Sequence, residues 1–266
     1  MNIFRFAADL LHVFAIATLL LKIWNTRSCA GISGKSQILF GLVYVTRYLD
    51  LFTTYVSLYN SVMKVFFVVT SAVAIFLIYV QYKKTYEHDL DLFRIELLLL
   101  PCAMLSLVIN HEDIVLEVLW TFSTYLESVA IIPQLFMVKK SGGIEKFMIR
   151  YLIAFGSYRA IYLINWAYRY IMESHYDLIA IFAGILQTII YILGFFLLRG
   201  VKVVVSDKEE EPQSPKKKNP LEAKWTPPSN HGNGKVVSVN IPEGPAEVHK
   251  LVIVANCTIP APGEKV

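Results

Sequence analysis

The chain has few charged residues and few cysteines for its length. Only 17% of its 266 residues are charged, and it contains three cysteines: Cys29, Cys102 and Cys257. The cysteines form no CxxC pair and show no regular spacing, which argues against a disulfide framework and against a zinc site. The sequence also contains no metal-ligand cluster, no phosphate-binding loop and no set of nucleophile and general base. We therefore predict no cofactor, no bound metal, no nucleic-acid partner and no enzymatic activity.

Long hydrophobic runs are abundant, and hydrophobic residues make up 55% of the chain. A helix needs roughly 20 apolar residues to cross the hydrocarbon of a bilayer. Seven windows qualify, approximately at residues 4–24, 37–57, 62–82, 94–110, 114–137, 149–171 and 177–199. The first window lacks a basic region in front of it and contains Arg5, Asp9 and His12, so we interpret it as a retained helix rather than a signal peptide. The pattern predicts an all-α membrane protein with seven transmembrane helices.

A faint internal repeat appears when the chain is aligned with itself at an offset of 112 residues. Residues 27–32 then fall on residues 139–144, each segment combining basic residues with Gly-Ile. Arg47 follows Gly31 by 16 residues, and Arg159 follows Gly143 by the same distance. This predicts two parallel three-helix repeats joined by a linker helix, the plan of small sugar transporters.

Basic residues concentrate in alternate predicted loops, those after the first, third and fifth windows. They are Arg27, Lys35, Lys83, Lys84, Arg94, Lys139, Lys140, Lys146 and Arg150. The positive-inside rule places these loops in the cytosol, which puts the N-terminus in a lumen or outside the cell and the C-terminus in the cytosol. We expect residues 1–200 to form the transmembrane domain and residues 201–266 to form a mostly disordered cytosolic tail. The lysine run 216–218 fits either a contact with membrane lipid or a vesicle coat protein, or a solvated linker.

Polar side chains recur at helical spacing in four of the windows, and residues three or four apart share one face of a helix. The four faces are Arg5, Asp9 and His12; Arg47 and Asp50; Glu117, Trp120, Thr124 and Glu127; and Tyr158, Tyr162, Asn165 and Arg169, with Arg159 beside them. An arginine at membrane depth costs several kcal/mol unless it is paired, hydrated or facing a cavity. The faces therefore predict one shared, water-filled cavity for an anionic ligand. The alternative is a set of scattered ion pairs that hold helices together.

The depth of each residue in the membrane follows from the predicted topology and the helical rise of about 1.5 Å per residue. It places Arg47 and Arg159 near mid-membrane. Four charged residues lie closer to the lumen: Arg5, Asp50, Glu117 and Arg169. This gradient suits an extended ligand whose carboxylate enters first, since a guanidinium offers a carboxylate two hydrogen bonds. A cationic group of the ligand would then remain near the lumen, where Trp120 either binds an ammonium by a cation–π contact or simply packs.

His12 is the one histidine inside a predicted span. Its protonation would add positive charge to a pocket for anions, so a ligand should bind better in an acidic compartment. Glu127 and Tyr158, both near mid-membrane, form a second candidate titratable pair.

Six segments carry a resemblance to a known family: residues 27–37 (RSCAGISGKSQ), 46–52 (TRYLDLF), 119–129 (LWTFSTYLESV), 132–137 (IPQLFM), 158–166 and 177–180. They resemble the endoplasmic-reticulum lumen protein-retaining receptors, or KDEL receptors, over residues 1 to about 198. The resemblance implies seven helices, a luminal N-terminus and shuttling between Golgi and endoplasmic reticulum. It implies that the ligands are soluble luminal proteins ending in Lys-Asp-Glu-Leu or a similar tetrapeptide.

The same resemblance implies roles for individual residues. Arg47 and Tyr48 are expected to bind the terminal carboxylate of the ligand. Its acidic side chains are expected at Arg5 and Arg169. Its lysine is expected at three residues: Asp50, Glu117 and Trp120. The polar faces add three further candidate ligand-binding residues: Arg159, Tyr162 and Asn165.

By resemblance, a proton-sensing network comprises His12, Glu127 and Tyr158, and Asp177 affects retrieval rather than binding. The chain departs from the family in two places. Ile192 and Leu193 stand where the family usually has a Cys-Asp pair, and the tail is far longer than usual, with its lysine run internal. These departures concern coat engagement and trafficking, not ligand recognition.

Two other classes of function remain compatible with the sequence. A small-solute transporter of the sugar-carrier type is suggested by the parallel repeat and by Pro133-Gln134, and a cell-surface signalling receptor also has seven spans. A sugar site needs amides and aromatic rings rather than four arginines. We therefore predict a cargo receptor that binds retrieval signals at acidic Golgi pH and releases them near neutral pH.

Overall fold

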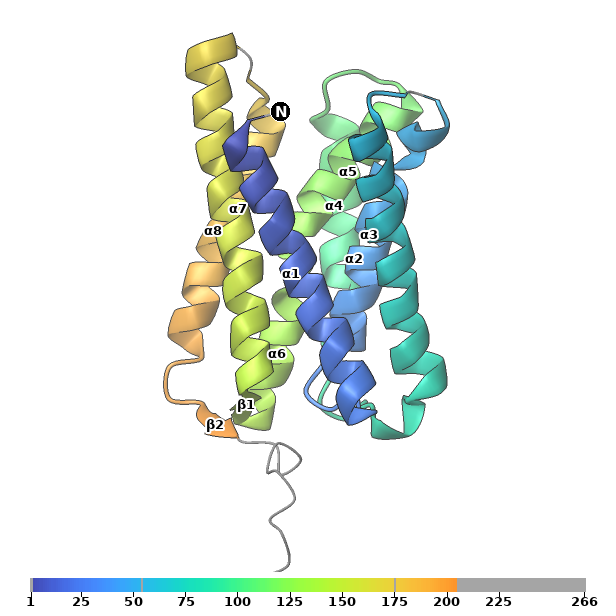
Figure 1. Cartoon of the computed structure of the whole chain (residues 1–266), viewed down its shortest axis with the longest axis vertical. Helices are drawn as coiled ribbons and strands as arrows, with labels where there is room; N and C mark the ends of the chain where they lie inside the picture. The colour runs from blue at the N-terminus through green and yellow to red at the C-terminus, as the bar shows by residue number, and fades with distance from the viewer. Residues whose placement is uncertain (1, 54, 175, 205–266) are drawn as a thin grey trace, which may run out of the picture. The chain divides into compact units, whose positions relative to one another are not determined.

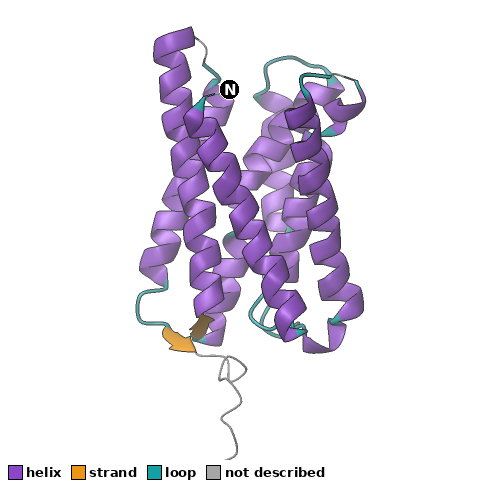
Figure 2. Cartoon of the chain, viewed as in Figure 1, coloured by secondary structure: helices purple, strands orange, loops and turns teal. Residues whose placement is uncertain are grey.

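The computed structural model describes residues 2–53, 55–174 and 176–204. The predicted tail, with its lysine run and Cys257, lies outside these residues apart from its first few positions. The described chain forms a bundle of helices (Figure 1): α1 (Ile3–Thr26), α2 (Gly34–Arg47), α3 (Leu58–Phe76), α4 (Glu96–Val108), α5 (Val115–Val129), α6 (Ile132–Ser141), α7 (Lys146–Glu173) and α8 (Leu178–Leu197). Two short strands, β1 (Gly143–Glu145) and β2 (Lys202–Val204), pair in parallel at the end of the bundle opposite the N-terminus. Figure 2 shows how small this sheet is beside the helices.

Among the described residues, five helical segments are long and apolar enough to cross a membrane. They are Ile3–Thr26, Leu58–Gln81, Val115–Ser141, Lys146–Glu173 and Leu178–Leu197. This confirms the prediction of a mostly α-helical membrane protein. The helices α2 and α4 are shorter, with 14 and 13 residues, so the count of seven spans stays a prediction.

Two predicted windows do not form single helices. The window 37–57 stops being α-helical at Arg47, and a 3₁₀ turn at Leu49–Phe52 follows. The window 114–137 breaks after Val129, and α6 begins at Ile132 with a proline in its first turn. Pro133 explains the break. Its ring would clash with the backbone carbonyl of the residue four positions earlier, and it has no backbone N–H to donate to that carbonyl.

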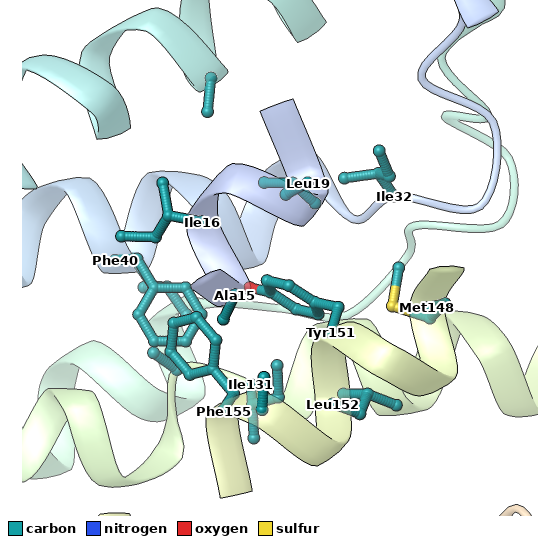
Figure 3. Packing of buried hydrophobic residues seen from close by; sticks show 14 of the residues in the cluster. Ala15, Ile16, Leu19, Ile32, Phe40, Ile131, Met148, Tyr151, Leu152 and Phe155 are labelled. Carbon is teal, nitrogen blue, oxygen red and sulfur yellow. The ribbon is translucent and has the colours of Figure 1, made fainter. Parts of the chain in front are cut away.

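The two helices with the most extensive mutual packing are α1 and α7. The helix α5 packs against α2, α4 and α8, and α3 packs on α2. Figure 3 shows part of the apolar core, with Ile16 of α1, Phe40 of α2 and Phe155 of α7. The ring centroids of Phe40 and Phe155 lie 5.0 Å apart. Gly184 of α8 leaves room for the Trp166 ring, since a Cβ there would lie 2.6 Å from it. This close approach brings α8 against the half of α7 that carries the polar face.

A buried polar network holds the loops at the end of the bundle that carries the strands. The Asp91 carboxylate, fully buried, accepts hydrogen bonds from the Ser33 hydroxyl at 2.9 Å, the Lys35 backbone N–H at 3.1 Å and the Tyr86 hydroxyl at 2.7 Å. Burial and the bond to Asp91 raise the pKa of Tyr86, so the phenol stays protonated. Gln134 accepts from the Ser33 N–H at 2.8 Å. The segment 27–37 is thus fixed by hydrogen bonds as well as by packing.

Candidate functional site

A cavity of about 190 Å³ lies within the half of the bundle that holds the N-terminus. It is lined by the first halves of α1 and α3, by the end of α2, by α5 from Trp120 to Glu127, by α7 from its middle onward and by the first turn of α8. Its described lining includes four cations and two carboxylates: Arg5, Arg47, Lys64, Arg159, Asp9 and Glu127. The charged lining therefore has an excess of two positive charges, which favours an anionic ligand. Aromatic side chains fill much of the remaining wall: Tyr48, Tyr59, Phe67, Trp120, Tyr158, Tyr162 and Trp166.

The floor of the cavity is built on one buried carboxylate. Glu127 of α5 is only 2% exposed, and its Oε2 accepts from the guanidinium groups of Arg47 and, at 2.7 Å, of Arg159. Its Oε1 accepts from the hydroxyl of Tyr158. Arg159 also donates to the Gln187 side chain of α8. Because two guanidinium groups share one carboxylate, this cluster retains one positive charge in a region with little access to water.

His12 lies beside this cluster in an aromatic sandwich. Its ring stacks on Tyr158 at a centroid distance of 4.3 Å and on Phe67 at 4.4 Å. Its Nε2 lies 2.7 Å from the hydroxyl of Tyr44. The histidine is buried and lines the cavity, so a change in its charge would act directly on a ligand there.

A second set of polar contacts lies nearer the mouth. Asp9 accepts from the hydroxyl of Tyr59 at 2.8 Å and from the hydroxyl of Tyr162, which links α1 to both α3 and α7. Lys64 of α3 donates to Asp50 of the 3₁₀ turn at 2.6 Å. These contacts tie α3 to α1 and to the turn after α2, and α1 to α7, across the cavity.

The structure brings together nine of the candidate site residues expected from the sequence. Arg5, His12, Arg47, Tyr48, Trp120, Glu127, Tyr158, Arg159 and Tyr162 all line the cavity, together with Asp9 and Thr124 of the same polar faces. The stripes on α1, α5 and α7 therefore meet, as their helical spacing predicted.

The other ligand-binding candidates lie outside the cavity lining, and their roles stay predictions. Arg169 does not line the cavity; its Nε donates to Glu173 at 2.7 Å on a partly exposed surface. It is ten residues beyond Arg159, about 15 Å along the helix, which carries it past the cavity. Asn165 is buried but accepts from Asn2 at 2.7 Å, outside the lining. Asp50 and Glu117 also lie outside the lining.

Asp177 caps the start of α8. Its Oδ1 accepts from the Ala180 N–H at 2.9 Å and lies 3.1 Å from Nε2 of His111. This position is consistent with a structural role, and the cavity lining does not include it.

Lys64 and Gln187 are the polar contributors that sequence reasoning missed. Lys64 lies in the second turn of α3 and is 7% exposed. Its helix face was visible as Tyr59, Asn60, Met63, Lys64 and Phe67, which recur at helical spacing and all line the cavity. Gln187 is fully buried in an otherwise apolar helix, which is itself a signal for a functional contact.

The fold and the site define a helical membrane protein with an internal cavity of net positive charge. The sequence profile of the family described as "ER lumen protein retaining receptor" matches residues 28–169. The chain belongs to this family, whose members are receptors, and it is not an enzyme.

Individual relatives agree with this assignment. A Drosophila melanogaster protein named ER lumen protein-retaining receptor is 68% identical over 212 residues, covering 80% of this chain and 100% of the relative. The human ER lumen protein-retaining receptor 2 is 55% identical over 208 residues, covering 78% and 98%. A Caenorhabditis briggsae relative of the same name as the fly protein is 54% identical over 211 residues, covering 79% and 99%. The relatives therefore match about four fifths of this chain over nearly their whole length.

Proposed function

We propose that the chain is a cargo receptor of endoplasmic-reticulum and Golgi membranes that binds C-terminal retrieval signals of the Lys-Asp-Glu-Leu type. In this proposal it binds cargo at acidic Golgi pH and releases it near neutral pH in the endoplasmic reticulum. The observation that carries the proposal is the shared carboxylate of Glu127, which leaves one guanidinium charge unbalanced at the cavity floor. The names of the relatives, which describe retention of luminal proteins, support the same choice.

The terminal carboxylate of the ligand fits best at Arg47. Its side chain is 17% exposed, against 6% for Arg159, so Arg47 is the more accessible of the two guanidinium groups. Tyr48 follows it in the chain and also lines the cavity. A ligand carboxylate at Arg47 would supply the charge that Glu127 alone does not balance, and a paired guanidinium binds a carboxylate through two hydrogen bonds.

The remaining contacts follow from the length of a tetrapeptide. Arg5 lines the cavity one turn above Asp9 and is proposed to bind an acidic side chain of the ligand. The candidates outside the lining are proposed to act on the N-terminal part of the ligand, Asn165 from a buried position through its hydrogen bond with Asn2. These candidates are Asp50, Glu117, Asn165 and Arg169.

The seven-span topology with two parallel repeats is also part of the proposal. The first helices of the two repeats start at Ile3 and Val115, and the second at Gly34 and Lys146, and both pairs are 112 residues apart. This spacing equals the offset of the sequence repeat. Arg47 and Arg159, which correspond at that offset, meet at the same carboxylate.

The orientation follows from the positions of charge and cavity. The cavity lies in the half of the bundle with the N-terminus, while the loops that follow α1 and α6 lie at the other end. With those basic loops in the cytosol, the cavity faces the lumen, where its cargo is. Residues 1–200 then form the receptor domain, and residues 201–266 form a cytosolic tail that starts with β2, paired with β1 of the bundle, and contacts membrane lipid or coat proteins.

The pH dependence is assigned to His12 together with Glu127 and Tyr158. A proton on His12 adds positive charge within the cavity that receives the ligand's anionic groups. If the bound state holds this proton more firmly than the free state, affinity rises as pH falls.

A binding experiment tests the proposal. The purified receptor is titrated at pH 5.5 with a fluorescent peptide ending in Lys-Asp-Glu-Leu and with the same peptide as its C-terminal amide. We expect the free acid to bind at least about 30-fold more tightly, the effect of about 2 kcal/mol for losing one partner of a buried charge pair. Equal affinity for acid and amide would exclude the cavity floor as a carboxylate site.

A further inference from the structure

The imidazole of His12 is enclosed by aromatic rings and has a single polar partner. Three rings surround it at centroid distances of 4.4, 4.3 and 5.1 Å, those of Phe67, Tyr158 and Phe155. Within the described residues, its one hydrogen-bond partner is the hydroxyl of Tyr44, 2.7 Å from Nε2. Tyr44 belongs to α2, is 2% exposed and does not line the cavity. It therefore acts on a ligand in the cavity through His12 and not by contact.

The direction of this hydrogen bond follows from the needs of the hydroxyl. Among the residues that the structure describes, Nε2 of His12 is the only acceptor within hydrogen-bond distance of the Tyr44 hydroxyl. A buried hydroxyl hydrogen that has no acceptor carries a desolvation cost. While His12 is neutral, the hydroxyl therefore donates to Nε2, and the ring proton lies on Nδ1.

Protonation of His12 reverses the bond. An imidazolium has two N–H donors and no acceptor, so Nε2 then donates. The oxygen of Tyr44 accepts this bond once its own hydrogen has rotated away. A hydrogen bond to a charged group is the stronger kind, so the hydroxyl serves both states of the ring and stabilises the charged state more.

The other groups around His12 act on its charge from its own helix and from the neighbouring ones. They share the cavity with it: Arg5 and Asp9 on α1, Arg47 and Tyr48 at the end of α2, Tyr59 and Lys64 on α3, Glu127 on α5, and Tyr158, Arg159 and Tyr162 on α7. The four cations oppose a proton on His12 and the two carboxylates favour it, so the balance in the empty cavity is against protonation. The anionic groups of a ligand shift this balance towards the charged ring.

We propose that Tyr44 is a positioning residue of the pH response and sets the pH at which the cavity gains the charge of His12. Its hydroxyl fixes the tautomer of the neutral ring and accepts from the charged ring. Loss of the hydroxyl therefore moves the response to lower pH. This inference deepens the proposed function and rests on it for the peptide, whereas the direction of the bond between Tyr44 and His12 does not depend on any ligand.

The pH profile of Tyr44→Phe tests the proposal. The substitution removes the hydroxyl and keeps the ring, which stacks on Phe67 at a centroid distance of 5.5 Å. The fluorescent peptide ending in Lys-Asp-Glu-Leu is titrated at a series of pH values from 5.0 to 7.4. Affinities of wild type and variant should agree at pH 7.4, where His12 is neutral. At pH 5.5 the variant should bind about fivefold more weakly, the scale on which a hydrogen bond to a charged group exceeds one to a neutral group. The midpoint of the profile should move down by about 0.7 pH unit, the logarithm of that factor.

Tyr151→Phe is the matched control for this profile. Tyr151 is a tyrosine of α7 that is 1% exposed, and its hydroxyl accepts from the Gln37 side chain at 3.4 Å. Its removal should leave the midpoint in place. A merely structural Tyr44 would lower the affinity by the same factor at every pH, so an unmoved midpoint in Tyr44→Phe would overturn the proposal.

Nitrogen NMR of the empty receptor tests the hydrogen bond without any peptide. In a receptor with isotope-labelled histidines at pH 7.4, the His12 signals are those that His12→Phe lacks. We expect the Nδ1–H tautomer with Nε2 as an acceptor in the wild type, and an Nε2 shift closer to that of an unbonded acceptor in Tyr44→Phe. An Nε2–H tautomer in the wild type would overturn the proposal. If the wild type bound no peptide at any pH, the proposed function would fall, whereas the tautomer would still decide whether Tyr44 donates to His12.

Discussion

The carboxylate of Glu127 should stabilise the empty receptor more than any other single side chain of the cavity. It is 2% exposed and accepts from Arg47, Arg159 and Tyr158. Glu127→Gln keeps the shape but leaves two guanidinium groups facing each other without a counter-charge. Removing one partner of a buried ion pair costs about 3–5 kcal/mol, so we expect the free energy of unfolding to fall by about that amount.

The same variant should respond more strongly to ligand. In the wild type Glu127 balances one of the two guanidinium charges at the cavity floor, and in Glu127→Gln neither charge is balanced, so the attraction for the ligand carboxylate is stronger. The tetrapeptide should therefore raise the melting temperature of Glu127→Gln by more than it raises that of the wild type, since a ligand stabilises a protein according to its affinity for the folded state.

Thermal unfolding in detergent, with and without peptide, measures both effects. Glu117→Gln is the matched control for the measurement without peptide, because Glu117 lies on the same helix and outside the cavity lining. It should change the free energy of unfolding by less than about 1 kcal/mol. A Glu127→Gln protein as stable as the control would refute the reading of Glu127 as the shared counter-ion.

Three further predictions concern pH, the loop network and the tail. Tetrapeptide affinity should fall as pH rises from 5.5 to 7.4, a window around the ordinary histidine pKa of about 6.5, and His12→Phe should remove most of that dependence; a flat wild-type profile would end the histidine hypothesis. Asp91→Ala should lower the free energy of unfolding by about 2 kcal/mol, because it leaves the hydroxyls of Ser33 and Tyr86 without their acceptor. Chemical denaturation measures this change, and an unchanged denaturation midpoint would contradict the prediction. Replacing residues 206–266 with a short lysine-ended tail should leave peptide affinity unchanged in the same titration, and lost binding would mean that the tail contributes to the site.

The sequence was informative where its signal was periodic. The stripes of Arg5, Asp9 and His12 and of Glu117 to Glu127 were visible as residues three and four apart, and most of them reach one cavity because helices present such residues on one face. The sequence was less informative where a helix changes character. Pro133 is a sequence signal for the break between α5 and α6, but a hydropathy window of about 20 residues does not resolve it. The end of α2 at Arg47 has no nearby proline or glycine that would indicate it.

Side-chain partners were the hardest feature to foresee. Arg169 belongs to the polar face of α7, yet its ion-pair partner is Glu173, four residues further along the same helix. This pairing within the helix is an alternative to a contact with a group in the cavity. Lys64 stood alone in an apolar window, so its partner Asp50, fourteen residues earlier, became evident only once the turn after α2 was in place. Long-range pairings depend on the packing of helices, which helical spacing alone does not determine.

The most direct measurement is the affinity of the wild type and of Arg47→Met for the Lys-Asp-Glu-Leu peptide as free acid and as C-terminal amide, at pH 5.5. The account predicts that Arg47→Met loses at least about 2 kcal/mol of binding free energy for the acid and little for the amide, so that the preference for the acid disappears. A variant that kept the full preference for the free acid would contradict the claim that the unbalanced guanidinium charge at the cavity floor binds the ligand's carboxylate.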